Sequence, residues 1–130
     1  MVDALHQAHT ALRAGALLVD LRPDGSRRPR VLRDRRVVGH LLYASESLGD
    51  DAAADAAVET MIGEGRFRRL RAGHAWYGYR FPGLDELDAY VGDSGRMAGY
   101  SPRTRERLAR RPQVPISIRR AAVYQFLERV

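Results

Sequence analysis

The chain of 130 residues is long enough for one domain with a single hydrophobic core, and its 45% hydrophobic content argues against a disordered protein. The absence of cysteine excludes disulfides, thiolate metal sites and a cysteine nucleophile. The sequence has neither an apolar run of about 18 residues nor a secretory leader, so we expect one cytoplasmic domain over residues 1–130 with no membrane contact.

The first elements predict a helix that feeds a strand. Apolar residues recur at helical spacing through Asp3–Arg13, and Gly15 is suited to end that helix. Ala16–Leu21 is an almost continuous apolar run before Pro23, which is typical of a strand buried on both faces. A helix joined to a buried strand by a short link indicates an α/β fold.

The middle of the chain predicts loops, short strands and one alanine-rich helix. The expected elements are a loop over Pro23–Arg30, two short strands within Val31–Tyr43 around Asp34 and Arg35, a helix over Asp50–Ile62, and two strands over Phe67–Ala72 and Ala75–Phe81. Gly73 and His74 separate the last two strands, which predicts a hairpin turn there.

The C-terminal part predicts two helices and a strand. Leu84–Val91 is a short helix, Gly92–Gly99 is a flexible link, and Ser101 with Pro102 is suited to begin a helix that ends at Arg111. The last segment is ambiguous because its first half alternates as a strand does and its second half has helical spacing. We favour a strand over residues 114–127.

Complete catalytic and cofactor motifs are missing from the sequence. His6 and His9 are spaced so that both rings could reach one metal ion, but no spacing selects a third ligand, and His9 lies on the apolar stripe of its helix. The glycine-bearing turns at 63–65 and 92–95 do not follow a buried strand and open a helix, so they are not phosphate loops.

Four residues are candidates for a substrate site. Asp20 and Arg22 end the predicted buried strand, and ligands of open α/β sheets bind at the carboxyl ends of strands. The alternative for this pair is an ion pair that fixes the following loop. His40 and Trp76 are further candidates, although aromatic residues at strand spacing, such as Trp76, belong to the core more often than to a pocket.

The first 23 residues resemble class I S-adenosylmethionine-dependent methyltransferases. In that family a helix ends in an L-R-P-G-G turn and feeds the fifth strand, and here the turn is Leu12-Arg13-Ala14-Gly15-Ala16, with alanine in place of the proline and the second glycine. G-E-G-R-F resembles the segment before the sixth strand, Y-R-F-P-G-L-D-E-L-D-A-Y a later strand-to-helix stretch, and V-P-I-S-I-R-R-A-A-V-Y-Q-F-L the seventh strand, antiparallel to its neighbours.

The resemblance implies a partial Rossmann-like fold, the C-terminal half of the methyltransferase fold. Its sheet would be small and mixed, with an antiparallel C-terminal part and flanking helices. The family places S-adenosylmethionine in the other half, so no residue of this chain inherits a cofactor role, and the cofactor would bind only if an upstream half were supplied. By topology, Asp20 and Arg22 would face the substrate side.

Three classes of function follow. The first is a methyltransferase-like protein or fragment that is catalytically silent alone and acts through association with itself or with a partner that completes its sheet. The second is a stand-alone small-molecule binding module with a pocket between the sheet and the alanine-rich helix. The third is a basic nucleic-acid-binding domain, suggested by the net charge of +6. Because the arginines are dispersed along the sequence, we expect such binding to be weak and indifferent to base sequence.

Overall fold

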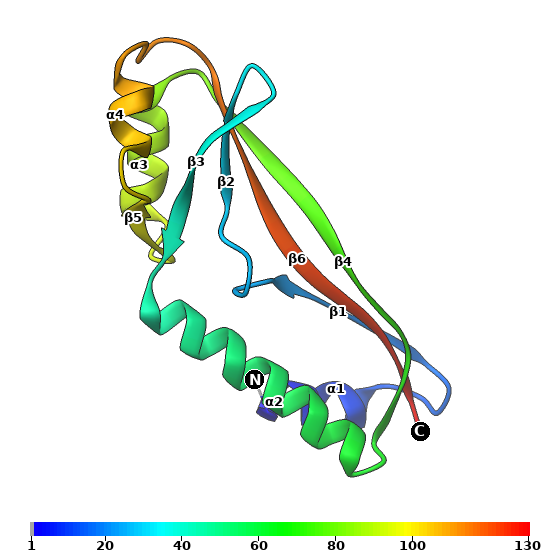
Figure 1. The fold of residues 1–130 in the computed structure, drawn as a ribbon. Helices are drawn as coiled ribbons and strands as arrows, with labels where there is room; N and C mark the ends of the chain where they lie inside the picture. The colour runs from blue at the N-terminus through cyan, green and yellow to red at the C-terminus, as the bar shows by residue number, and fades with distance from the viewer. Residues whose placement is uncertain (1) are drawn as a thin grey trace. The chain divides into compact units, whose positions relative to one another are not determined.

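The computed structural model describes residues 2–130, which form four helices and six strands (Figure 1). The helices are α1 (Val2–Ala11), α2 (Ser45–Gly63), α3 (Leu84–Asp93) and α4 (Thr104–Ala109). The strands are β1 (Leu17–Pro23), β2 (Arg30–Arg33), β3 (Arg36–Tyr43), β4 (Phe67–Phe81), β5 (Met97–Tyr100) and β6 (Ile116–Arg129). None of the helices within residues 2–130 combines the length and the apolar character needed to cross a membrane.

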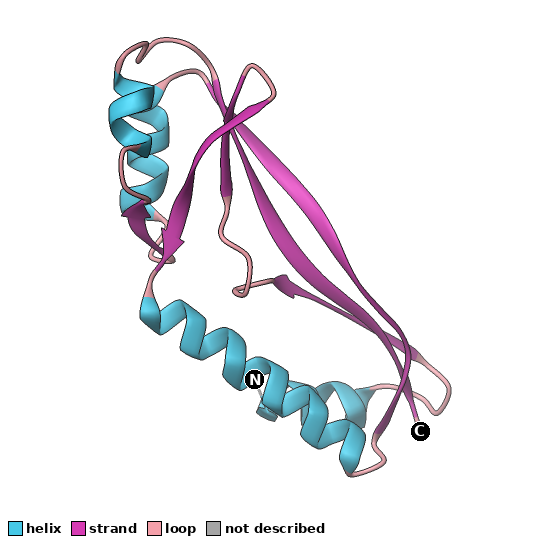
Figure 2. Ribbon diagram, viewed as in Figure 1, coloured by secondary structure: helices cyan, strands magenta, loops and turns pink. Residues whose placement is uncertain are grey.

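Contacts group these elements into two compact units. Unit 1 comprises the described residues up to Pro23 together with Gly49–Ala75 and Ala122–Val130, and unit 2 comprises Asp24–Leu48 and Trp76–Ala121. The two longest strands, drawn in magenta in Figure 2, are β4 and β6. Both contribute to both units, as does α2.

Unit 1 contains β1, the C-terminal part of β6 and the N-terminal part of β4, with α1 and α2. β1 pairs antiparallel with β6, from Leu17 opposite Glu128 to Pro23 opposite Ala122. Side chains from both helices and the sheet form its core, namely Leu5, Ala57, Val58, Met61, Phe67 and Leu127. The apolar spacing of the helices is therefore used to cover one face of this sheet.

Unit 2 is built around the β2–β3 hairpin. β3 pairs on its other side with β5, and β2 pairs with the N-terminal part of β6, all antiparallel. Its core contains Val31, Leu41, Tyr43, Leu84, Leu87, Met97, Leu108, Ile116 and Ile118. Gly39 of β3 lies against Thr104 of α4 so closely that an added Cβ would be 2.0 Å from the Thr104 Oγ1 atom.

The sheet is antiparallel throughout the described residues, in the order β1-β6-β2-β3-β5 with β4 also paired to β6. The expectation of a mixed sheet was wrong. Parallel strands need long crossover connections on one face, whereas here β6 returns against β1, β2 and β4 in the opposite direction. The coarser expectation of an α/β protein with helices flanking a sheet is confirmed.

The hairpin expected around Gly73 and His74 was also wrong, because β4 is one strand of 15 residues. Gly73 has no positive φ and makes no turn. Its lack of a side chain instead makes room for Tyr124, whose Oη would lie 2.5 Å from an added Cβ. Glycine in a strand thus marks a close approach here and not a turn.

The expectation that the strand at Ala16–Leu21 is buried on both faces was wrong as well. Alternate residues of β1 are exposed, with Leu17 at 51%, Val19 at 53% and Leu21 at 66% of their surface accessible. The helices cover only the face that carries Leu18, and an almost continuous apolar run does not reveal how many faces are covered.

The remaining differences lie at element ends. The link expected over Gly92–Gly99 contains the start of β5, which is too short to give a sequence signal. Helix α4 has Arg103 and not Ser101 before its first residue, because the Ser101 hydroxyl accepts from the His40 N–H and bonds the Thr104 hydroxyl. The strand favoured over residues 114–127 is confirmed as β6.

Candidate functional site

Asp20 and Arg22 meet on the helix-covered face of β1. They are two residues apart on a strand, so both side chains point the same way. The Arg22 Nε donates to the two Asp20 carboxylate oxygens at 2.9 and 3.0 Å, and its Nη1 lies 2.7 Å from the Asp55 Oδ1 of α2. Both β1 side chains are nearly buried, at 11% and 13% exposure. Burial lowers the pKa of Arg22, but hydrogen bonds to Asp55 and Asp20 and their charges outweigh it, so the net pKa is raised.

Two further residues extend this pair into a network. The Gln125 Nε2 donates to the Asp20 Oδ2 at 2.8 Å, and the Gln125 Oε1 accepts from the Arg69 Nε at 2.8 Å. Arg69 also forms an ion pair with Glu59 of α2. The result is a chain of groups in which every charge has an opposite or hydrogen-bonding neighbour.

A hollow of about 310 Å³ opens beside this network. It is lined by Arg22, Asp55, Glu59, Arg69, Ala72, Gly73, His74, Val123, Tyr124 and Gln125. This is where the sequence predicts a pocket between the sheet and the alanine-rich helix. Because its arginines and carboxylates are already paired with one another, a charged ligand would have to displace an existing partner.

His40 and Trp76, the other two candidates, lie in unit 2. Arg30 of β2 is the antiparallel partner of His40 on β3, and its guanidinium stands 4.2 Å from the centre of the Trp76 ring. On its other side Arg30 is the partner of Arg119 on β6. The four candidates therefore fall into two groups, Asp20 with Arg22 in unit 1 and His40 with Trp76 in unit 2.

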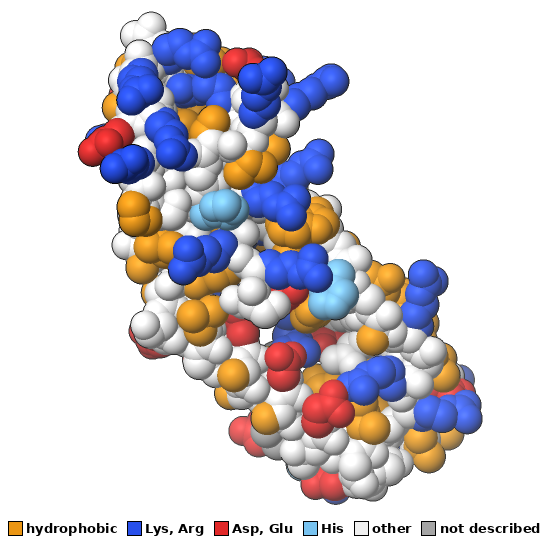
Figure 3. Space-filling view, viewed as in Figure 1, with side chains coloured by type: hydrophobic (Ala, Val, Ile, Leu, Met, Phe, Trp, Pro, Cys, Tyr) orange, Lys and Arg blue, Asp and Glu red, His pale blue; other side chains and the backbone are white. Residues whose placement is uncertain are grey.

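The distribution of charge differs sharply between the units. Unit 2 contains 15 arginines and 8 acidic residues, a net charge of +7, whereas unit 1 contains 7 arginines and 8 acidic residues, a net charge of −1. Figure 3 shows arginine side chains crowded over α3, α4 and the β2–β3 turn, while acidic and basic side chains intermingle in the region of α2 and the start of β4. The arginines are dispersed in the sequence and concentrated in the fold.

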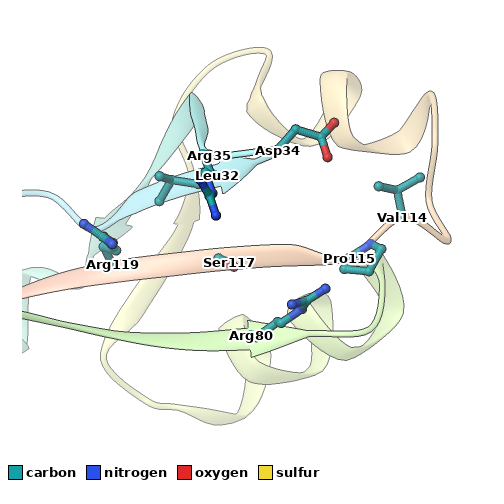
Figure 4. Close-up of a pocket in the computed structure, with 8 residues that line it drawn as sticks. All are labelled: Leu32, Asp34, Arg35, Arg80, Val114, Pro115, Ser117 and Arg119. Atoms are coloured by element: carbon teal, nitrogen blue, oxygen red, sulfur yellow. The ribbon is translucent and has the colours of Figure 1, made fainter.

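Sequence reasoning missed a second hollow, of about 430 Å³, on unit 2. It is lined by Leu32, Asp34, Arg35, Arg80, Val114, Pro115, Ser117 and Arg119 (Figure 4). These residues come from the β2–β3 hairpin, β4, β6 and the loop before β6. The one local signal was the pair Asp34-Arg35 between two short strands, which placed an arginine at a hairpin tip.

The His9 side chain of α1 lies against the core of unit 1. The His9 ring packs edge-on against Phe67 of the unit 1 core, with 5.4 Å between ring centres. The described residues contain no group of three side chains placed to hold a metal ion.

No protein-family model matches the chain, and no curated protein matches its sequence.

Proposed function

We propose that the protein is a methyltransferase-like polypeptide, catalytically silent alone, that acts by associating with a second copy of itself through unit 1. The family resemblance equates β1, β4 and β6 with the fifth, sixth and seventh strands. Two arrangements support this: β6 pairs with both β1 and β4, and a helix precedes each of those strands, α1 before β1 and α2 before β4. No residue of this chain is proposed to hold S-adenosylmethionine, and one-site calorimetric binding of it would contradict the proposal.

The proposal rests on the unpaired edge and the exposed apolar face of β1. Among the described residues it pairs only with β6, so the N–H and C=O groups of its other edge have no strand partner. The same strand exposes Leu17, Val19 and Leu21 on one face. An apolar strand with a free edge is a template for pairing with another chain, and soluble proteins normally protect such an edge.

Symmetry and charge both favour a second copy as the occupant. A two-fold axis beside β1 places an identical strand antiparallel to it, and this geometry forms a complete ladder without any new sequence. Unit 1 has a net charge of only −1, so two copies meet there with little repulsion, whereas the +7 of unit 2 opposes contact between two such units.

Light scattering tests the proposal. We expect the wild-type chain to be a dimer at tens of micromolar and Val19→Asp to be monomeric, because a carboxylate on the apolar face would be buried without a partner. Val37→Asp is the matched control, since Val37 is 49% exposed on β3 of unit 2, and it should leave the dimer intact. A monomeric wild type, or equal dissociation by both variants while circular dichroism shows a folded protein, would overturn the proposal.

The two alternatives have less support. A small-molecule module would use the hollow beside Arg22, where the charges already satisfy one another. A nucleic-acid-binding domain is favoured only by the charge of unit 2, and the acidic residue Asp34 lies among the arginines that line its hollow.

A further inference from the structure

Three arginines line the hollow of about 430 Å³ on unit 2, and none of their side chains has a hydrogen-bond or ion-pair partner among the described residues. Arg35, Arg80 and Arg119 approach it from the hairpin tip, β4 and β6, with the Ser117 hydroxyl between them (Figure 4). Some other exposed arginines have acidic partners, as Arg68 has Glu128 and Arg105 has Asp88. Three like charges around one hollow repel one another and favour an anion between them.

The hairpin tip presents Arg35 at a cost in backbone strain. Arg33 and Arg36 pair with each other, so Asp34 and Arg35 form a two-residue turn, with φ of 52° and 64°. In such a turn asparagine followed by glycine fits best, because a side chain disfavours positive φ. An arginine stands where glycine would be least strained, and strained residues cluster at binding sites.

The hollow is also lined by apolar side chains. Leu32 lies at one end of it and Val114 and Pro115 at the other (Figure 4), and its volume lies in the range that holds a small organic ligand. Asp34 stands on its rim and also lines the neighbouring hollow, which contains Arg107 and Arg111. Asp34 forms an ion pair with Arg111 and so interrupts the row of arginines that a phosphodiester chain would follow from one hollow to the other, which favours a compact ligand over a nucleic acid.

We propose that this hollow binds a compact phosphorylated molecule, whose phosphoryl group is held by Arg35, Arg80 and Arg119 and whose apolar part lies against the apolar side chains at one of its ends. Guanidinium groups bind phosphoryl oxygens through paired, charge-assisted hydrogen bonds. The proposal is independent of self-association, because it rests on unit 2 alone.

Calorimetry on the full chain with phenyl phosphate as the probe tests this. We expect phenyl phosphate to bind more tightly than inorganic phosphate, because only the ester has an apolar part. Arg35→Gly should weaken binding about tenfold while the melting temperature stays equal or rises, since glycine relieves the turn. Arg80→Gln and Arg119→Gln should each weaken it by a similar factor.

Arg103→Gly is the matched control. Arg103 also has positive φ, at 66°, lies in unit 2 and is exposed, but does not line the hollow, so this variant removes the same charge and relieves the same strain. It should leave the affinity for phenyl phosphate unchanged, as should Val19→Asp in unit 1. Equal weakening by Arg103→Gly and Arg35→Gly would overturn the proposal. So would no phenyl phosphate binding at millimolar concentration, or tighter binding of a short single-stranded oligonucleotide that displaces the ester.

Discussion

The two units share strands β4 and β6 but present different chemistry on the faces of the sheet that their cores leave free. In unit 1 the exposed side chains of β1 are leucine and valine, and four of its seven arginines, Arg22, Arg66, Arg68 and Arg69, are paired with carboxylates. In unit 2 the corresponding surface has arginines without partners around a hollow. The average over the chain, a net charge of +6, describes neither unit. The location of charge is therefore more informative than its sum: unit 1 is suited to meeting another apolar strand, and unit 2 to holding an anion.

The largest effect is expected from a substitution in the unit 1 core, which tests whether the two units unfold together or separately. Phe67 is 2% exposed in the unit 1 core, and Phe67→Ala should lower the free energy of unfolding by about 3–5 kcal/mol. Because β4 and β6 contribute to both units, we expect a single transition in urea, with circular dichroism and the fluorescence of Trp76 shifting together. A Trp76 transition that stays in place while the circular dichroism shifts would mean that unit 2 unfolds separately.

The next largest loss of stability is expected at Gly39, whose backbone lies against α4 in unit 2. Gly39→Ala would place a Cβ 2.0 Å from the Oγ1 of the fully buried Thr104, and moving α4 away should cost about 3 kcal/mol. Gly63→Ala at the end of α2 has open space around the new Cβ, so it should be neutral or slightly stabilising. Chemical denaturation of both variants measures the difference, and equal stabilities would mean that α4 does not pack as described.

The paired charges of unit 1 provide a third test. Arg22→Met removes the cation from the nearly buried Asp20, and we expect a loss of about 2 kcal/mol. Arg66→Met breaks an exposed pair with Glu64 in the same unit and should change stability by less than about 0.5 kcal/mol. If Arg22→Met were equally silent but lost affinity for a ligand, the network would be a binding site and not a structural one.

The smallest effect concerns acid sensitivity in unit 2. The hydrogen bond from Arg105 lowers the pKa of Asp88; burial opposes this, and a hydrogen bond from Tyr100 adds to the lowering. A carboxyl group with a lowered folded pKa stabilises the fold above its unfolded pKa of about 3.9, and that contribution is lost as the pH falls through the folded value. Asp88→Asn should remove less than about 1 kcal/mol at neutral pH and flatten the stability profile below about pH 4. Asp93→Asn on the same helix is the control, and an identical flattening there would contradict the assignment.

Elements with strong periodicity were predictable from the sequence. α1, α3 and β6 lie close to their expected places, because their apolar spacing or alternation reflects one covered face. The sequence pattern cannot tell whether a glycine makes a turn or makes room for a distant side chain. Gly73 does the second, because it lies against Tyr124 of β6. Burial of β1 on one face depends on what the helices cover, and an apolar run cannot show that.

The candidate sites were predictable to different degrees. Asp20 and Arg22 could be placed on one strand face because they are two residues apart, but Asp55 and Gln125 join them from distant segments. The hollow on unit 2 draws Arg35, Arg80 and Arg119 from three segments with no common motif. Their proximity results from strand pairing, so it cannot be predicted by counting charges along the sequence.

Hydrogen exchange at β1 tests the central claim, that unit 1 supplies an association surface, most directly. Peptides that cover Leu17–Pro23 should exchange more slowly at high protein concentration than at low concentration, because a second β1 would bond the amides that face away from β6. Peptides of the β2–β3 hairpin should exchange at the same rate at both concentrations. Exchange at β1 that is independent of concentration, or protection that appears in the hairpin instead, would contradict the account.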